Sequence, residues 1–376
     1  MFKTFNDPLT GKKITKLSPN GIICHHPYFY NKMFTSDGRF LIYAQENSGS
    51  RNIYSLDLQD GSSKLIASSG DEPLADFGVT LSSDDKNLFY CRGNRIIRQN
   101  MKTGETAVLY TAPEGWDGYS NPSFSSDDRY IVTVEIWKED VIPATGGWDT
   151  FEPQWRKNPR CRIVYIDTEK NTSHVVHEEK LWLGHPQIRP RHNGDISFCH
   201  EGPATRIDAR LWFIKADGTG MVCLHNQKRD EIITHEFWLA DGSKLAFVYR
   251  KFLTGPDKDG RYGDEVINVK QSIRYANADT VTEEFIMDCS VYCHSITSPD
   301  NTLLVGDGQK TAEPFIYLTD LKTKKETILC RHDTKWKSYG NNQDAHPHPA
   351  FTPDSKKIVF TSDRDGLPGI YLAEIC

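Results

Sequence analysis

The sequence predicts an all-β protein, a single-domain β-propeller of seven blades that spans residues 1–376. A turn motif recurs seven times between Thr35 and Ser355, as TSDG, SSDD, SSDD, HNGD, ADGS, SPDN and TPDS. Asp, Asn, Gly and Pro favour such turns. The spacing of roughly 45 to 60 residues is typical of propeller blades. No long helical periodicity competes with this pattern.

An apolar or alternating segment follows each turn, and a second strand often comes next. The first segments read FLIYA, NLFYC, YIVTV, ISFCH, KLAFVY, TLLVGD and KIVFTS. A β-sandwich would not repeat this unit seven times. The last unit has about three strands, so we expect an N-terminal strand, KKITKLS at 12–18, to close it and remove a sheet edge. Segments 138–159 and 253–264 are expected to be loops that wall a pocket.

Composition limits the possible partners. The hydrophobic fraction is 38% and the charged fraction 26%, as in soluble globular proteins. A net charge of -6 without a basic stripe argues against nucleic acid. No apolar run is long enough for a membrane helix, and the N-terminal segment lacks the apolar region of a signal peptide. The 9 cysteines include no CxxC pair and predict reduced thiols in a cytoplasm. Nothing indicates an obligate protein partner.

The repeat also identifies equivalent positions in the different blades. Six residues before the Asp or Asn of each turn stand Asn31, Gly78, Asn121, Gln187, His235, His294 and His348. The strand that leads into this turn is the innermost of a blade, beside the propeller axis. Three consecutive blades thus carry His at one equivalent place, which predicts a histidine site at one end of the axis.

A second histidine accompanies the last of these. His346 and His348 are two residues apart, so they face the same side of an extended segment, which Pro347 and Pro349 stiffen. Neutral imidazoles suit Mn, Fe, Ni, Cu or Zn. A carbonyl oxygen from Gln343 or Asn342 would favour Mn or Fe, and the lack of a thiolate ligand disfavours structural zinc. Because neighbours on a strand face opposite ways, we expect Cys293 to be a core residue.

The fourth blade supplies cationic candidates. They are His185, Arg189, His200 and Arg210. Arg210 begins the strand RLWFIKADG, next to the strand that carries His200, and a guanidinium suits bidentate binding of a carboxylate. A surface salt bridge remains the alternative for Arg189, and the individual functions of His185 and His200 stay open.

Several long segments resemble the oligogalacturonate lyases, cytoplasmic bacterial enzymes that complete pectin breakdown. They read CHHPYFYNKMFTSDG, LGHPQIRP, FCHEGPATRIDARLWFIKADGTG, THEFWLADGSKLAFV, VYCHSITSPDNTLLVGDGQ and QDAHPHPAFTPDSKKIVFTSD. The resemblance runs from about Phe5 to the end of the chain and implies a seven-bladed propeller. It also implies a divalent metal, most often Mn²⁺, on His294, Gln343, His346 and His348. His235 falls on the family's Brønsted base and Arg210 on its substrate-contacting arginine.

The resemblance therefore predicts a carbon–oxygen lyase for a small acidic oligosaccharide. Digalacturonate and its 4,5-unsaturated form would be cleaved by metal-assisted β-elimination to 5-dehydro-4-deoxy-D-glucuronate. Arg210, His200, His185 and Arg189 are the candidate substrate-binding residues.

Three other functions agree less well with the sequence. A glycoside hydrolase needs two facing carboxylates, and Asp76, Glu201 and Asp344 share no blade register. A non-catalytic sugar- or protein-binding propeller would not need histidines in register. The propeller of a serine peptidase is disfavoured because no G-x-S-x-G motif is present.

Overall fold

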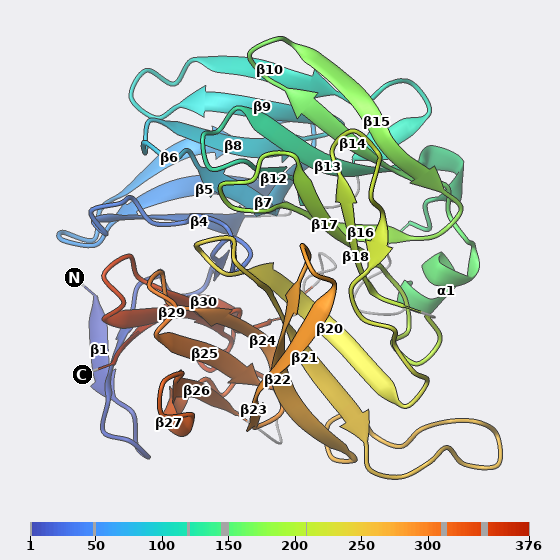
Figure 1. Ribbon diagram of the computed structural model, residues 1–376. Coiled ribbons are helices and arrows are strands. Elements are labelled where there is room, and N and C mark those ends of the chain that lie inside the picture. Colours follow the sequence, from blue (N-terminus) through green and yellow to red (C-terminus); the bar gives the residue numbers. More distant parts are fainter. Residues whose placement is uncertain are drawn as a thin grey trace. The chain divides into compact units, whose positions relative to one another are not determined.

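The computed structural model describes residues 2–47, 50–118, 121–143, 150–207, 209–309, 314–339 and 345–375. Strands dominate the described chain (Figure 1) and form seven antiparallel sheets, the predicted number. Two compact units contain them: Met1–Thr111 with His294–Cys376, and Ala112–Cys293. That the chain acts as one domain stays a prediction.

The first unit contains four sheets. In pairing order their strands are β1 (Lys3–Asn6), β2 (Lys13–Lys16), β30 (Gly369–Glu374), β29 (Lys357–Ser362) and β28 (Ala350–Phe351); β3 (Ile23–His25), β4 (Phe40–Asn47), β5 (Ser50–Asp57) and β6 (Ser63–Ser68); β10 (Thr106–Thr111), β9 (Arg95–Asn100), β8 (Asn87–Arg92) and β7 (Leu74–Leu81); and β24 (Tyr292–Thr297), β25 (Leu303–Gly308), β26 (Phe315–Asp320) and β27 (Lys325–Arg331).

The second unit contains three sheets. Their strands are β11 (Trp116–Gly118), β12 (Ser123–Phe124), β13 (Tyr130–Trp137), β14 (Cys161–Asp167) and β15 (Thr172–Glu179); β16 (Leu183–Ile188), β17 (Asp195–His200), β18 (Leu211–Lys215) and β19 (Val222–Cys223); and β20 (Glu231–Trp238), β21 (Leu245–Phe252), β22 (Val269–Asn277) and β23 (Thr282–Cys289).

N-terminal strands complete the last sheet, as predicted. β2 lies within the predicted segment 12–18 and pairs antiparallel with β30, and β1 adds a further strand outside it. The two chain ends accordingly lie near each other beside β1 (Figure 1). Ile14 of β2 is fully buried among apolar side chains of β25, β26 and β29. The closing strand is thus part of the core.

One predicted loop differs from expectation. Segment 138–159 contains a 3₁₀ turn, η1 (Lys138–Asp140), and a short helix, α1 (Phe151–Arg156). The ring of Phe151 packs 5.0 Å, between centroids, from Trp182. Six residues are too few for a stable isolated helix, so this packing is what stabilises α1. Segment 253–264 contains no strand or helix, as predicted.

One backbone hydrogen bond closes the turn of every blade. The donors are the N–H groups of Thr35, Ser82, Ser125, Arg189, Leu239, Ser298 and Thr352. The acceptor carbonyl stands five residues later in six blades, but Arg189 bonds to Asp195, six residues later. The fourth turn therefore contains one extra residue.

This hydrogen bond corrects one predicted equivalence. His235 stands four residues before the donor of this bond in its blade, and His185 stands four residues before the donor in the fourth blade. The prediction that Gln187 is the equivalent of His235 was therefore wrong. The strand pairing agrees, because β16 shifts register between Gly184 and Gln187 as β20 does between Thr234 and Phe237. His185 and His235 also share positive φ values, 46° and 52°. Four consecutive blades thus carry His at this position.

The cysteines and helices of the described residues agree with the expectations from composition. Eight cysteines are free thiols, and Cys293 is buried as predicted. Among these residues, no helix combines the length and the apolar character that crossing a membrane requires.

We expect Ile14→Ala to lower the free energy of unfolding by about 2–5 kcal/mol, since it leaves a cavity in the core. Lys13→Ala is the control on the same strand, because Lys13 is half exposed and forms a surface ion pair with Glu374. Urea unfolding of the metal-free protein, followed by circular dichroism, measures both. Equal midpoints for the two variants would contradict a core position for β2.

Candidate functional site

Three of the predicted metal ligands lie together in the first unit. His294 comes from β24, and His346 and His348 come from the extended segment that precedes β28. The ring centroids of His294 and His348 are 4.1 Å apart, and His346 lies 5.5 Å and 5.3 Å from them. One nitrogen from each ring lies within 4.8 Å of the other two. The three imidazoles form a group that can hold one metal ion.

Aromatic rings enclose this histidine group. Tyr28 and Phe77 lie 5.0 Å and 5.3 Å from His348, and Trp336 lies 4.6 Å from His346. Burial, reinforced by the nearby His294, lowers the pKa of His346 to about 3. His346 is therefore neutral at pH 7, which is the form that binds a metal. Of these rings, Tyr28 lies in the segment CHHPYFYN, but nothing in the sequence alone connects that segment with the histidine group.

A buried carboxylate supports the group and was missed in the sequence. Asp307 in β25 accepts hydrogen bonds from His294 and from the backbone of His348. On the other side, Nε2 of His26 lies 3.3 Å from the carbonyl oxygen of Pro347, between the two ligands. Burial lowers the pKa of His26 to about 4, so this ring is neutral as well.

Three imidazoles that each offer one ring nitrogen fit a divalent transition metal such as Mn, Fe or Zn. Gln343, the fourth ligand that the family resemblance implies, lies outside the described residues, as do Asn342 and Asp344. The metal centre therefore rests on His294, His346 and His348.

In the second unit, Arg210 and His185 share one carboxylate. Arg210 immediately precedes β18 and is 6% exposed. Its Nη2 donates to Glu201 over 3.1 Å and its Nε to Glu236 over 3.1 Å. Nε2 of His185 lies 3.2 Å from the same oxygen of Glu201. Burial opposes ionisation of Glu201, but Arg210 and His185 hold the pKa of this carboxyl below its usual value.

His235 lies on β20, in the same unit, and is partly exposed. Its positive φ of 52° coincides with the register shift of β20. Nδ1 of its ring is 3.0 Å from the hydroxyl of Thr234. The interruption of strand pairing thus sets the direction of this side chain.

His200 and Arg189 have other partners. Nε2 of His200 lies 2.9 Å from Glu179, and its ring packs 5.0 Å from Trp212. Arg189 is buried and donates to Asp195, to both oxygens of Asp279 and to the carbonyl of Gly242. These contacts favour a structural function for Arg189, and its binding to substrate stays a prediction.

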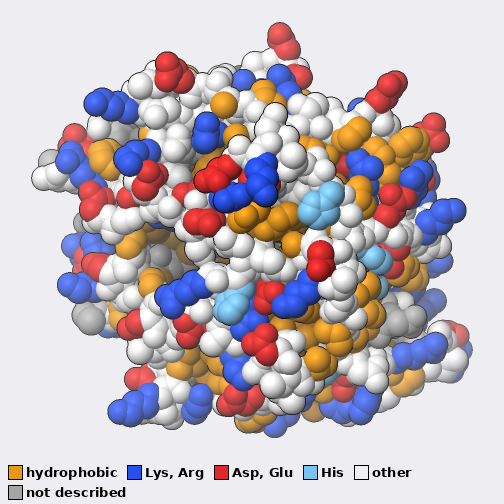
Figure 2. Space-filling model, turned by 45° about the horizontal axis from the view of Figure 1, so that its top comes forward, with side chains coloured by type: hydrophobic (Ala, Val, Ile, Leu, Met, Phe, Trp, Pro, Cys, Tyr) orange, Lys and Arg blue, Asp and Glu red, His pale blue; other side chains and the backbone are white. Residues whose placement is uncertain are grey.

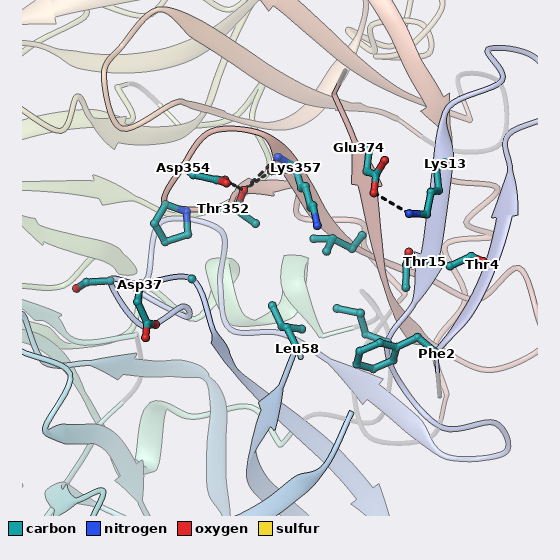
Figure 3. Close-up of a pocket in the computed structure, with 15 residues that line it drawn as sticks. Phe2, Thr4, Lys13, Thr15, Asp37, Leu58, Thr352, Asp354, Lys357 and Glu374 are labelled. Atoms are coloured by element: carbon teal, nitrogen blue, oxygen red, sulfur yellow. Dashed lines mark hydrogen bonds and ion pairs between the residues drawn. The ribbon is translucent and has the colours of Figure 1, made fainter. Parts of the chain in front are cut away.

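A separate cavity of about 540 Å³ belongs to a different part of the first unit (Figure 3). Phe2 and the Lys13–Glu374 ion pair line one side of it, and Asp37 and Asp354 line another. These aspartates stand in the turns that end the inner strands, whereas the histidines stand at the beginning of those strands. None of the predicted site residues lines this cavity.

Charges of both signs alternate on the face of the molecule shown in Figure 2. Lys and Arg side chains stand next to Asp and Glu side chains there, and histidines appear between them. Among the described residues drawn there, neither sign of charge forms a continuous surface.

Seven antiparallel sheets with a buried group of three histidines define a metal-binding β-propeller. A family model described as oligogalacturonate lyase matches residues 1–376. The oligogalacturonide lyase of Pectobacterium atrosepticum is 37% identical over 390 residues, which cover 100% of this chain and 96% of that protein. The chain belongs to the oligogalacturonate lyase family.

Solved structures confirm the predicted fold class. An oligogalacturonate lyase in complex with manganese matches with a TM-score of 0.91 and 36% identity, over 100% of this chain and 96% of that one. The oligogalacturonate lyase of Vibrio parahaemolyticus matches with a TM-score of 0.88 and 34% identity, over 100% and 97% of the two chains. The seven sheets are therefore the blades of a propeller.

We expect the protein to bind one equivalent of Co²⁺, a spectroscopic probe for the histidine group. His294→Ala and His348→Ala should each weaken binding by about 100-fold or more, since even the partners of metal ligands contribute ~10–100-fold. His174→Ala is the control, because His174 is exposed and its contacts are with the carbonyl of Ala216 and the ring of Tyr165, away from the histidine group. Visible absorption titrations measure the affinities. Unchanged binding by both ligand variants would contradict the assignment.

Proposed function

We propose that the protein is an oligogalacturonate lyase that binds Mn²⁺ and cleaves short oligogalacturonates by β-elimination. The observation that carries this proposal is the group of three histidines, two of them buried, in a chain of this family. A related structure contains manganese, which supports the choice of metal. Digalacturonate and 4,5-unsaturated digalacturonate are the proposed substrates.

The difficult step is removal of the proton at C5 of galacturonate, which is α to the C6 carboxylate. The electron pair left at C5 forms the C4–C5 double bond, and the glycosidic oxygen leaves from C4. Ionisation beside a carboxylate would create a dianion, so positive charge at that carboxylate is the main requirement. When bound by His294, His346 and His348, Mn²⁺ supplies such charge as a Lewis acid.

We assign proton removal to His235. A neutral imidazole with a pKa near 7 is a suitable base at physiological pH. The hydroxyl of Thr234 contacts Nδ1, and this contact supports Nε2 as the accepting atom. The positive φ of His235 supports a functional assignment too, because strained residues of this kind cluster at functional sites.

We assign binding of a substrate carboxylate to Arg210, with His185 beside it. Glu201 and Glu236 hold the guanidinium in one orientation, which reduces the entropy that binding would cost. His185 contacts the same Glu201 and stands at the blade position equivalent to His235. These links support a joint site for an acidic sugar, to which His200 is proposed as a further contact.

We place the reaction in the cytoplasm and its end product as 5-dehydro-4-deoxy-D-glucuronate. The free thiols of the described cysteines support a reducing compartment. No obligate protein partner is proposed.

Incubation of digalacturonate with the Mn²⁺-loaded protein should give one galacturonate and one 4,5-unsaturated galacturonate, whose ring opens and tautomerises to 5-dehydro-4-deoxy-D-glucuronate. Chelation should abolish formation of this product, and added Mn²⁺ should restore it, because the C6 carboxylate is then neutralised again. Products are separated and identified by mass spectrometry, since the elimination product is lighter than galacturonate by one water. Two galacturonates would indicate a glycoside hydrolase, and unaltered substrate would indicate a binding protein.

We expect His235→Ala to lower kcat by about 10²–10⁴-fold, the usual contribution of a general base. Mn²⁺ affinity and the unfolding midpoint should stay at wild-type values, which separates loss of the base from loss of the fold. His174→Ala serves as the matched control with wild-type turnover. Near-normal kcat in His235→Ala would exclude it as the base.

A further inference from the structure

Asp307 is the residue that connects the two ligand-bearing segments of the metal centre. It lies in β25, the strand after the one that carries His294, and its side chain is 0% exposed. Oδ1 accepts the backbone N–H of His294 over 2.5 Å. Oδ2 lies 3.0 Å from Nδ1 of His294 and 3.3 Å from the backbone nitrogen of His348.

A carboxylate at this depth requires compensation for its lost hydration. Two backbone N–H groups supply part of it, because that of His294 donates to Oδ1 and that of His348 donates to Oδ2. Both oxygens of Asp307 therefore serve as acceptors, and Nδ1 of His294 is the donor in its contact with Oδ2.

This direction of donation determines the state of His294. A neutral imidazole carries one proton, and Asp307 retains it on Nδ1. The lone pair of His294 then lies on Nε2. A carboxylate behind a histidine is a common way to orient a metal ligand and raise its basicity.

The carboxylate of Asp307 also contacts His348, which belongs to the next blade. His348 has a positive φ of 46°, a conformation that histidine adopts only where its surroundings impose it. The bond from its backbone N–H to Oδ2 is one such restraint. Asp307 thus anchors the ring of one ligand and the backbone of another.

We propose that Asp307 is a positioning residue of the metal centre, which fixes the Nδ1–H tautomer of His294 and aligns His348. The inference rests on the proposed metal site, but its test does not depend on lyase turnover. The sequence places this residue in SPDNTLLVGDG, 13 positions after His294.

Asp307→Asn tests the assignment in the full-length protein. The variant keeps the shape of the side chain, but only one of its two terminal atoms can accept a hydrogen bond, so the three donors at Asp307 can no longer all be satisfied. We expect Mn²⁺ affinity, measured by calorimetry and electron paramagnetic resonance, to fall by about 10–100-fold. Wild-type Mn²⁺ affinity in the folded variant would overturn the proposal.

Asp7→Asn is the matched control in the same unit. Asp7 is also buried and also accepts backbone N–H groups, from Leu9, Thr10 and Arg331. We expect this variant to lose stability and to retain wild-type Mn²⁺ affinity. An equal loss of affinity in both variants would show that any buried aspartate has this effect and would overturn a specific function of Asp307.

The imidazole tautomer gives a test that requires no variant to fold. In metal-free wild-type protein with ¹⁵N-labelled histidine, the ring nitrogen signals of His294 should show the proton on Nδ1. A proton on Nε2 would overturn the proposal, whatever the variants do. Absence of lyase activity with this tautomer present would instead contradict only the proposed reaction.

Discussion

One backbone hydrogen bond, repeated in every blade, closes the turn that follows each inner strand. It joins the N–H at the end of that strand to the carbonyl at the start of the next, and so fixes the register between the first two strands of the blade. The position four residues before its donor is therefore equivalent in all seven sheets. His185, His235, His294 and His348 occupy it in four successive blades, and the chemistry of the protein depends on this regularity.

At the metal centre, the histidines at this position are shielded from water. Aromatic rings surround His294 and His348, and burial keeps His346 uncharged at neutral pH. Three imidazoles beside these rings gain much from a divalent cation, because the ion restores the polar interactions that burial removed. Packing and metal binding are thus linked at the same three side chains.

The sequence predicted the strand repeat, the N-terminal closing strand and the HxH pair because each has a local signature. Turn residues mark the blades, and alternation by two marks a shared face. The fourth-blade equivalent of His235 was predicted as Gln187, two residues after the correct position, His185. The fourth turn contains one extra residue, and its Asn193 stands four residues after the hydrogen-bond donor, whereas Asp241 stands two residues after its own donor. Only the hydrogen bond reveals this difference.

The sequence did not identify Asp307 and Tyr28 as neighbours of the metal ligands, because their contacts with His348 join segments far apart in the chain. Likewise, nothing in the sequence shows that the guanidinium of Arg189 donates its hydrogen bonds to Asp195, Asp279 and Gly242. The family resemblance supplied Gln343, which the described residues do not include. Local patterns therefore indicate the ligands, and tertiary structure indicates what holds them.

The pairing of β2 with β30 has a consequence for synthesis on the ribosome. Residues 13–16 are made long before their partner at 369–374. Until that partner has been made, β2 offers an unpaired edge, and its apolar Ile14 has no neighbour from β29. The nascent chain must carry this edge while the blades between the two strands are made, so a chaperone that shields extended segments would raise the yield of folded protein.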